Sequence, residues 1–363
     1  MSLPPRQRRQ LFELLRQGPL SRTALVERLR MRRNTVYADM NDLLEQRLVE
    51  EIGPSAHGVG RPRVPLQIDS ASRHVLGLSF QPGRIEIGRF TPLGQPVGAA
   101  RTQAISRAGA IGTAGRLIGE WRNKATVAIG VMAPGLIDQQ RDEVALSVAF
   151  AGAAPMSLEP VRDAAGGLPI VIDTEAHAVA ARWILQQGAD AERDTLLIYF
   201  DDGTLGAAFI TGGRPNRGCI RGGNELGHTR LPVKTAPCYC GATGCLERLC
   251  DSHDLRKHGL AVDFAQALAD GKSLNHRAIA RMVRFLSLGF ANAVNFTRAG
   301  QVVVASQMAH SDALLDRLVE STREQLLPQL RDRVDWATWP DADARSAHTA
   351  ACLGMVALYL EDW

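Results

Sequence analysis

The sequence predicts an α/β protein in which an N-terminal winged helix–turn–helix domain precedes a larger body of strands and helices that contains a zinc loop. Three observations lead to this prediction. Arginines concentrate in residues 1–68, where apolar helical stripes are followed by short strands. After residue 69, apolar strands alternate with amphipathic helices. A cysteine-rich loop runs from Glu225 to Glu247.

Length and composition are those of an ordinary globular protein. The 363 residues, 45% hydrophobic and 22% charged, are enough for two or three domains. No run approaches the roughly 18 apolar residues needed to span a membrane, and no apolar signal core follows the basic N-terminus. We therefore expect no membrane partner and a cytoplasmic location, where clustered thiols bind metals more often than they form disulfides.

Positive charge is concentrated at the N-terminus. Residues 1–68 hold 12 arginines, no lysine and 7 acidic residues, whereas the rest of the chain holds 30 basic and 31 acidic residues. A basic head on a nearly neutral body predicts that the head binds a polyanion such as nucleic acid.

The first domain is expected to begin with two helices. Residues 6–17 place their large apolar side chains on one helical stripe, and the Gly-Pro pair that follows ends this helix. Ser21 suits the N-cap of the next helix. A third helix is predicted over 34–46, followed by a short strand over 48–52 and a Gly/Pro-rich tip with a return strand over 53–68. Arg47 stands where the turn after such a helix often has glycine, which indicates a strained residue or a different helix end.

In a winged helix–turn–helix domain the third helix enters the major groove of DNA, and its exposed N-terminal residues reach the base edges. Arginine can pair with guanine and asparagine with adenine, each through two hydrogen bonds. The start of the second helix supplies phosphate contacts, and a thin basic wing suits a minor groove. The predicted DNA-contacting residues are Ser21, Arg22, Thr23, Arg32, Arg33, Asn34, Thr35, Tyr37, Arg61 and Arg63. The alternative is a domain that mediates only protein contacts and whose arginines form a solvated face; the charge, the layout and the basic wing favour DNA.

The loop from Glu225 to Glu247 predicts a metal site. Its candidate ligands are His228, Cys238, Cys240 and Cys245. Three thiols and one imidazole make the ligand set of a closed, tetrahedral structural zinc site. A disulfide pair or inert thiols are the alternatives, but three cysteines fall within eight residues of a chain that has six in total, which favours one structural Zn²⁺.

The same loop resembles a known signature. Glu-Leu-Gly-His, followed nine residues on by Cys-x-Cys-Gly-x-x-Gly-Cys-x-Glu, is similar to the motif of the ROK family of repressors, open reading frames and kinases. The resemblance implies a two-lobed, actin-like (RNase H-like) ATPase-fold body, with a first lobe over 69–185 and a second over 186–363 whose last helix packs back on the first lobe. It also implies that the histidine and cysteines bind zinc, while Glu225, His228 and Glu247 face a sugar.

Three elements of the family's nucleotide site are missing. Family kinases carry Asp-x-Gly-Gly-Thr between the first two strands, where this chain has Ser-Phe-Gln-Pro-Gly-Arg at 79–84. Leu205 replaces the middle glycine of a Gly-Thr-Gly hairpin, and Ala-Ser-Gln at 305–307 replaces a Gly-Gly pair beneath the adenine. Phosphoryl transfer needs the metal and phosphate contacts that these elements supply. We therefore expect no enzyme activity and no catalytic residue.

Glu175 is a fourth candidate for effector binding. The resemblance aligns Thr174, Glu175 and His177 with an asparagine, the catalytic aspartate and a second asparagine of the kinases. The extra methylene of glutamate moves the carboxylate by about 1 Å, which phosphoryl transfer tolerates poorly. Glu175 is thus either an effector-binding group, with Glu225, His228 and Glu247, or an ordinary hydrogen-bonding carboxylate near the pocket.

The expected function is that of a DNA-binding transcriptional regulator, most commonly a repressor, whose body senses a sugar or phosphosugar. One alternative is a regulator without a small-molecule ligand, controlled by a protein partner or by oligomerisation. The other is a sugar kinase with an accessory domain, which the missing nucleotide elements disfavour. The expected partners are a double-stranded DNA operator and further copies of the chain, as a homodimer or tetramer.

Overall fold

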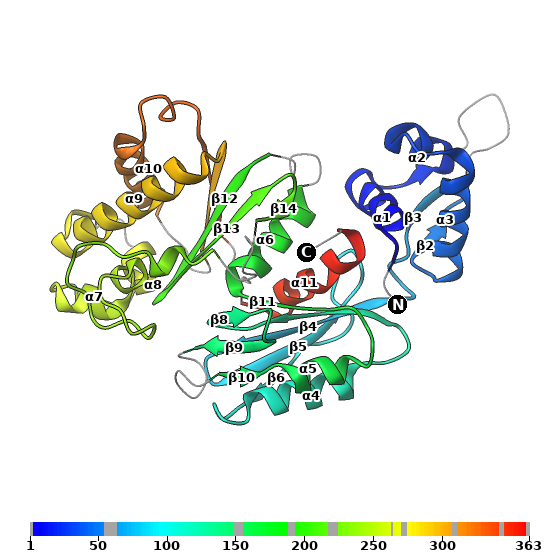
Figure 1. The fold of residues 1–363 in the computed structure, drawn as a ribbon, viewed down its shortest axis with the longest axis horizontal. Helices are drawn as coiled ribbons and strands as arrows, with labels where there is room; N and C mark the ends of the chain where they lie inside the picture. The colour runs from blue at the N-terminus through cyan, green and yellow to red at the C-terminus, as the bar shows by residue number, and fades with distance from the viewer. Residues whose placement is uncertain are drawn as a thin grey trace.

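The structure, a computed structural model, shows an N-terminal domain beside a larger body that is built on two five-stranded sheets (Figure 1). It describes residues 3–53, 64–147, 155–187, 193–216, 224–262, 264–269, 274–306, 311–340 and 345–360. The predicted wing residues Arg61 and Arg63, and Gln307 of the nucleotide-site comparison, lie outside the described residues.

The N-terminal domain contains three helices and a small antiparallel sheet with strand order β1-β3-β2. Its elements are α1 (Pro5–Gln17), β1 (Leu20–Ser21), α2 (Arg22–Leu29), α3 (Arg33–Glu45), β2 (Val49–Glu51) and β3 (Pro65–Ile68). The apolar stripes read from the sequence are the buried faces of these helices, including Leu11 in α1, Leu25 in α2 and Val36 in α3. This is the element order expected of a winged helix–turn–helix.

Two local predictions in this domain are confirmed. Ser21 is the N-cap of α2, since its hydroxyl accepts a hydrogen bond from the Ala24 amide at 3.2 Å. Arg47, which follows α3, has a φ of 55°. A side chain in this left-handed conformation costs about 1–2 kcal/mol relative to glycine, so Arg47 is strained.

The first sheet of the body has the strand order β11-β7-β4-β5-β6, with β11, β7 and β4 parallel to one another. Its strands are β4 (His74–Gln81), β5 (Arg84–Phe90), β6 (Arg101–Ala104), β7 (Thr126–Met132) and β11 (Ile170–Asp173). Helices α4 (Ala110–Trp121) and α5 (Glu159–Ala165) cover its outer face (Figure 1). Three short strands form a separate antiparallel sheet: β8 (Leu136–Asp138), β9 (Glu143–Leu146) and β10 (Met156–Ser157).

The second sheet has the order β14-β13-β12-β15-β16. Its strands are β12 (Thr195–Asp201), β13 (Thr204–Thr211), β14 (Arg214–Pro215), β15 (Gln301–Ser306) and β16 (Asp335–Pro340). Between β14 and β15 the described chain forms η2 (Leu226–His228), η3 (Leu246–Leu249), α7 (Ser252–Lys257), α8 (Phe264–Ala269) and α9 (Arg277–Thr297), and between β15 and β16 it forms α10 (Asp312–Gln325). Every residue of β12 is buried, as expected for a central strand covered on both faces. No helix among the described residues has the length and apolarity needed to cross a membrane.

Helices α6 (Glu175–Gln187) and α11 (Ala347–Tyr359) lie between the two sheets (Figure 1). Helix α11 packs on the first sheet so closely that a Cβ at Gly77 would lie 1.8 Å from the Ala347 carbonyl oxygen. The last helix therefore does contact the first lobe. Helix α6 packs on the second sheet, where a Cβ at Gly206 would lie 2.8 Å from that of Ala176. The boundary expected between the two lobes at residue 185 thus falls inside α6. This helix contributes to the packing of both lobes.

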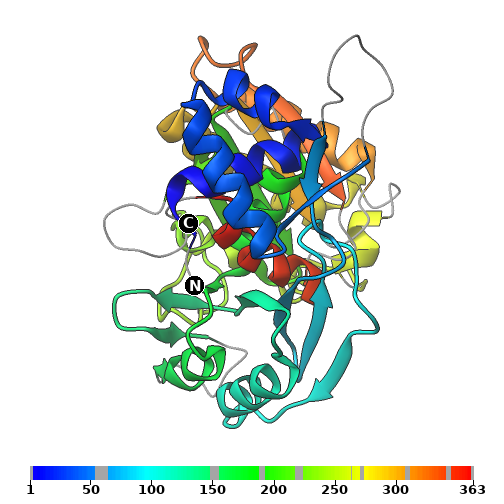
Figure 2. The ribbon, with the colours of Figure 1, turned by 90° about the vertical axis from the view of Figure 1, so that its right-hand side faces the viewer.

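The C-terminal end of α11 reaches the N-terminal domain, which Figure 2 shows in front of the body. Nη1 of Arg8, in α1, donates a hydrogen bond to the Leu360 carbonyl at 2.9 Å. The buried Tyr359 hydroxyl donates to the Pro92 carbonyl at 2.7 Å. One continuous apolar cluster includes residues of α1, α2, α3, α6 and α11. The N-terminal domain is thereby joined to the core of the body.

His74, the first residue of β4, predicts a pH-dependent stability. Its ring is buried, and Nε2 lies 2.8 Å from Thr126 Oγ1. Burial, with a smaller contribution from Arg89, lowers the pKa of His74 from 6.5 to about 4. The folded state therefore favours the neutral imidazole, so this contribution to stability is complete above pH 6.5 and is lost as the pH falls towards 4.

We expect the wild-type free energy of unfolding to drop by up to about 3 kcal/mol from this group between pH 7 and pH 4. His74→Gln keeps a polar partner for Thr126 but has no proton to gain, so it should lose correspondingly less. Urea unfolding of both proteins at the two pH values measures the difference. An equal loss in both would show that His74 ionises normally in the folded state.

Candidate functional site

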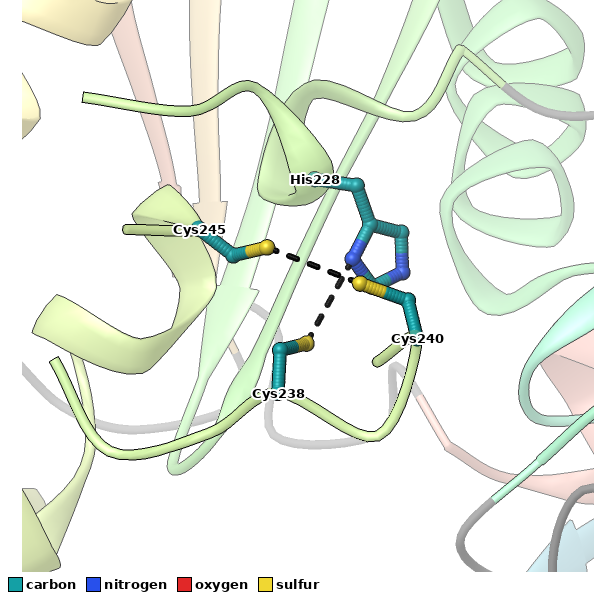
Figure 3. A group of neighbouring side chains, drawn as sticks. All are labelled: His228, Cys238, Cys240 and Cys245. Carbon is teal, nitrogen blue, oxygen red and sulfur yellow. Dashed lines mark hydrogen bonds between the residues drawn. The ribbon is translucent and has the colours of Figure 1, made fainter. Parts of the chain in front are cut away.

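The four predicted zinc ligands point towards one another (Figure 3). One ligand atom from each of His228, Cys238, Cys240 and Cys245 lies within 4.8 Å of all the others. The Cys238 Sγ to His228 Nδ1 distance is 3.6 Å, and so is the distance between the Sγ atoms of Cys240 and Cys245. A tetrahedral zinc site has edges of about 3.6–3.8 Å, whereas a disulfide bond is about 2.05 Å long. The donor set fits a tetrahedral metal ion and does not form a disulfide.

Backbone geometry brings these ligands together. Gly241 and Gly244 both have a φ of 86°, which lets the loop turn tightly between the second and third cysteines. The Leu231 amide donates to the Gly244 carbonyl at 2.8 Å, and the Leu246 amide donates to the Thr229 carbonyl at 3.0 Å. These bonds fix the position of the last cysteine relative to His228.

The histidine has a second partner that the sequence did not indicate. His228 Nε2 lies 3.0 Å from Tyr239 Oη, and the two rings meet edge to face at 5.0 Å. If Nδ1 binds a metal, Nε2 carries the proton and donates a hydrogen bond to the phenol oxygen of Tyr239. Tyr239 then fixes the tautomer and ring orientation of the ligand, as outer partners of metal-binding histidines commonly do.

Three of the four predicted effector-binding residues meet in one pocket. Glu175, Glu225 and Glu247 line a cavity of about 50 Å³ together with Tyr239. They come from the start of α6, the residue before η2, and η3 itself. The fourth residue, His228, has its Nε2 4.0 Å from Glu225 Oε2, and this nitrogen faces Tyr239.

Glu247 combines one hydrogen-bonded oxygen with one buried oxygen that has no partner among the described residues. Oε2 accepts a hydrogen bond from the Leu205 amide at 3.2 Å, whereas Oε1 is buried and has no hydrogen-bond partner within the described part of the chain. Burial, opposed by the Leu205 amide, raises the pKa of Glu247 to about 7. Burial also raises the pKa of Glu225. A buried oxygen without a partner at a pocket wall suits a hydroxyl donor from a ligand or water.

A larger cavity of about 570 Å³ shares Glu175, Tyr239 and Glu247 with the small pocket. It lies between two hairpin turns, one at Gly83 and one at Gly203, whose φ values are 70° and 69°. A cavity of this size suits a small organic molecule.

Arg345 lies at the boundary of the two lobes and was not found from the sequence. Its Nε is 3.2 Å from Glu175 Oε1 and 3.7 Å from Asp201 Oδ2, while Nη2 donates to Thr204 Oγ1 at 2.8 Å. Burial raises the pKa of Glu175, and the guanidinium opposes this shift. Burial would lower the pKa of Arg345, but the neighbouring carboxylates outweigh it and raise that pKa instead.

The backbone of Arg345 is held by the segment that differs from the family's first phosphate loop. Ser79 Oγ and Gln81 Nε2 both donate to the Arg345 carbonyl at 2.7 Å. In the family kinases this strand end carries the aspartate that positions magnesium. In this chain the same strand end positions the start of α11.

A second buried pair was also missed. His177 Nδ1 lies 2.9 Å from Asp173 Oδ1, and both side chains are fully enclosed. His177 Nε2 has no hydrogen-bond partner among the described residues. The resemblance aligned His177 with an asparagine of the kinases. It did not indicate that Asp173, the last residue of the preceding strand β11, is the partner of His177.

The predicted DNA-contacting residues of the described chain gather at the starts of α2 and α3. Arg32, Arg33 and Asn34 are exposed at the N-terminus of α3, and Thr35 and Tyr37 are half-buried behind them. Ser21 and Thr23 lie half-buried at the start of α2.

Arg22 is held more firmly than the sequence suggested. Its Nη1 pairs with Glu51 Oε1 at 2.8 Å, and its side chain is only 18% exposed. The guanidinium carbons of Arg22 and Arg33 lie 5.9 and 5.1 Å from the centre of the Tyr37 ring. Both guanidinium groups therefore lie within cation–π distance of the same aromatic ring.

The sequence model of the ROK family matches residues 100–362 of the chain. The chain is 24% identical to the DNA-binding transcriptional repressor Mlc of Escherichia coli (strain K12) over 339 residues, which cover 86% of this chain and 83% of that protein. It is 24% identical to a glucokinase of Halalkalibacterium halodurans over 246 residues, or 61% of this chain and 74% of that protein.

Solved structures share the fold. A crystal structure of a ROK family transcriptional regulator, described as a homolog of the E. coli MLC protein, matches with a TM-score of 0.79 and 21% identity and covers 98% of this chain and 96% of its own. A ROK glucokinase from Streptomyces griseus, in complex with glucose and AMPPNP, matches with a TM-score of 0.60 and 18% identity and covers 76% of this chain and 98% of its own. The regulator structure thus spans the N-terminal domain and the body, whereas the glucokinase leaves about a quarter of this chain unmatched.

Proposed function

Because this chain belongs to the ROK family, we propose that it is a DNA-binding transcriptional repressor whose two-lobed body responds to a sugar or phosphosugar. The observation that carries the proposal is the exposed Arg32-Arg33-Asn34 face at the start of α3, on a domain joined to the ROK body. Similarity along most of the chain to a transcriptional repressor supports the same function.

On DNA, the N-terminal half of α3 would enter the major groove, where Arg33 and Asn34 meet base edges. Ser21, Arg22 and Thr23 would contact phosphates, and the wing arginines 61 and 63 would enter a minor groove. Two such heads on a homodimer or tetramer would read two half-sites of an operator. The proposed double-stranded DNA partner would require a cytoplasmic location.

The test is fluorescence anisotropy of the full chain on duplex DNA from upstream of its own gene, at several salt concentrations. We expect the Arg33→Ala and Asn34→Ala variants each to lose about 10- to 100-fold in affinity, because a bidentate contact to a base is worth about 1–3 kcal/mol.

Arg116→Ala is the matched control for the lost charge, since Arg116 is exposed on α4 in the body. It should bind DNA like the wild type. If Arg116→Ala and Arg33→Ala lose the same DNA affinity, the loss reflects the removal of a positive charge and not a contact between Arg33 and a base. Binding without any sequence preference would refute the proposed operator contacts.

We also propose one structural zinc ion on His228, Cys238, Cys240 and Cys245. The tetrahedral spacing of the donor atoms supports this assignment. When bound, the ion supplies no chemistry beyond holding the ligands as thiolates and a neutral imidazole. The protein's own part is to place Glu225 and Glu247 at either end of the closed loop, where both line the effector pocket.

Kinase activity is not part of the proposed function. Arg345 lies against Glu175, the position of the catalytic aspartate, and Ser79 and Gln81 are bonded to the backbone of the same arginine. The Leu205 side chain is buried at the second hairpin. These contacts support a body without kinase activity, because phosphoryl transfer needs a free base, a metal site and open backbone for phosphate.

A regulator without a small-molecule effector is the second candidate, and one observation favours it. The Tyr239 hydroxyl lies 3.0 Å from His228 Nε2, which is the nitrogen that would otherwise contact a sugar. The anisotropy titration decides between the two candidates when it is repeated with a panel of sugars and phosphosugars. Selective DNA binding that one of them alters supports the sensor.

A further inference from the structure

The N-terminal domain and the body enclose a cavity of about 460 Å³ that shares no lining residue with the cavities around Glu175 and Glu247. Its walls come from α1 and α2, from the C-terminal end of α11, and from the turn between β13 and β14 of the second lobe. We propose that this junction is a second ligand site, which binds an oligophosphate anion: free diphosphate or the diphosphate group of a nucleotide. The bound anion bridges the N-terminal domain to the second lobe.

One face of α1 forms the first wall. Arg9, Phe12, Glu13 and Arg16 follow the helical spacing i, i+3, i+4 and i+7, so these side chains lie along one stripe. Leu11 lies on a neighbouring face of the helix, which is buried. The stripe is therefore the part of α1 that remains for the junction with the body (Figure 1).

The opposite wall is a tight hairpin turn of the second lobe. Gly212 and Gly213 have φ values of 57° and 74°, and Thr211 pairs with Arg214 directly across the turn. Two successive positive φ values are typical of a type I′ turn, which glycine adopts without strain. The turn brings Arg214 and both glycines into the cavity wall.

Four arginines line this cavity, and they come from three different elements. Arg9 and Arg16 belong to α1, Arg28 to α2 and Arg214 to β14. Glu13 is the only acidic residue among the described lining residues, so this wall has a formal charge of +3. Positive charges that converge on one hollow raise the local concentration of anions, and a multivalent anion between them relieves their mutual repulsion.

The glutamate compensates only part of this charge. Glu13 Oε1 lies 3.3 Å from Arg28 Nη1, which is longer than the roughly 2.7–2.9 Å of a charge-assisted hydrogen bond. The exposed side chain of Arg9 makes no hydrogen bond or ion pair with any residue that the structure describes. The acids Glu361 and Asp362, which follow α11 in the sequence, lie outside the described residues.

An oligophosphate suits these side chains better than a single carboxylate does. A planar guanidinium group donates two parallel hydrogen bonds to phosphate oxygens, and arginines on facing walls can bind adjacent phosphates. Phe12 and the buried Tyr359 and Leu360 make part of the wall apolar, and ion pairs are screened less there than on an open surface. The guanidinium carbon of Arg16 lies 5.6 Å from the centre of the Phe12 ring, a cation–π contact that steadies it at this wall.

Isothermal titration of the full-length protein tests the site with inorganic phosphate, diphosphate and ADP, at fixed ionic strength and without magnesium. We expect diphosphate to bind at least about tenfold more tightly than phosphate, because only the longer anion reaches arginines on both walls. ADP that binds more tightly than diphosphate would identify a nucleotide as the source of the group. Equal or weaker binding of ADP would identify the diphosphate group itself.

Arg9→Gln and Arg214→Gln remove one guanidinium from each of the two walls, and each should weaken diphosphate binding by at least about fivefold. Both side chains are exposed, so both variants should fold. Arg107→Gln is the matched control, because Arg107 is an exposed arginine that lines the cleft cavity instead. It should bind diphosphate like the wild type.

Three outcomes of these titrations would overturn the proposed site. The first is diphosphate that binds no more tightly than phosphate, or that does not bind. The second is unchanged affinity in both Arg9→Gln and Arg214→Gln, which would place the anion elsewhere on the protein. The third is an equal loss in Arg107→Gln, which would show a general effect of charge.

The bridge between the domains has a separate readout, which rests on the proposed DNA-binding function. A bridging anion restricts α1 and α2 relative to the second lobe, so diphosphate should change the DNA dissociation constant of the wild type by about fivefold or more at fixed ionic strength. Arg214 lies in the body, so Arg214→Gln should bind DNA like the wild type when no diphosphate is present. In this variant the effect of diphosphate should fall to less than about twofold.

An undiminished effect of diphosphate in Arg214→Gln, or no effect in the wild type, would overturn the bridge. A weaker DNA affinity of Arg214→Gln without diphosphate, beyond that of Arg107→Gln, would assign this arginine to the DNA contact surface and also overturn it. A wild-type protein that binds no DNA would refute the proposed function, whereas the diphosphate titration would still decide whether the site exists.

Discussion

Replacement of Cys240 by serine is expected to abolish metal binding and to give the largest loss of stability of any single substitution in the second lobe. The binding free energy of structural zinc sites reaches about 10–16 kcal/mol in small zinc domains, and it is part of the folding free energy. A serine hydroxyl is a poor ligand, so the tetrahedron would lose one corner and the loop between Glu225 and Glu247 would open. We expect zinc to fall from about one to near zero per chain by elemental analysis, with a fall in the melting temperature.

Cys250→Ser is the matched control. Cys250 is buried beside the same loop, and its thiol donates to the Glu247 carbonyl at 3.3 Å, but it is not one of the four ligands. This variant should keep its zinc. The N-terminal domain should stay folded in Cys240→Ser, since its core is built from α1, α2 and α3 rather than from the loop. A wild-type protein that contains no zinc would refute the proposed metal.

Gly130→Ala adds a single methyl group in β7 of the first lobe. We expect it to destabilise the protein almost as much as Cys240→Ser does. A Cβ at this position would lie 1.8 Å from the Ala350 carbonyl oxygen and 2.6 Å from the Gly354 amide nitrogen. Both atoms belong to the backbone of α11, so no side-chain rotation can relieve the clash. We expect Gly130→Ala to cost at least about 4 kcal/mol, in the range of the most severe core substitutions, or to prevent folding. Urea unfolding of the full chain measures the effect.

Gly119→Ala makes the same chemical change where there is space. Gly119 lies in α4, and a Cβ there would meet nothing within 4 Å. Alanine stabilises a helix relative to glycine, so this variant should gain up to about 1 kcal/mol. If Gly130→Ala unfolds at the same urea concentration as the wild type, then α11 does not rest on β7 as described.

These two predictions differ in what the sequence could contribute to them. The candidate zinc ligands could be picked out from the sequence because all four fall within 18 residues, and short glycine-containing turns can bring such neighbours together. The same short-range signature identified the ROK family, which the family match over residues 100–362 confirms. The helices of the N-terminal domain were equally predictable, since a stripe with helical period and a capping serine are local patterns.

The sequence by itself therefore determined the candidate ligand set, the helical stripes, the cap at Ser21 and the unusual position of Arg47, because each depends on residues a few positions apart. Only the tertiary structure decided that Arg345 meets Glu175 and that Tyr239 takes the free nitrogen of His228. It also decided that α6 packs on the second sheet and α11 on the first. These contacts arise when the folded chain brings distant segments together, and no periodicity or spacing in either segment records its partner. The sequence located the candidate metal loop, and the tertiary structure placed Arg345, which precedes α11, in the wall of the same cavity as Glu175 and Glu247.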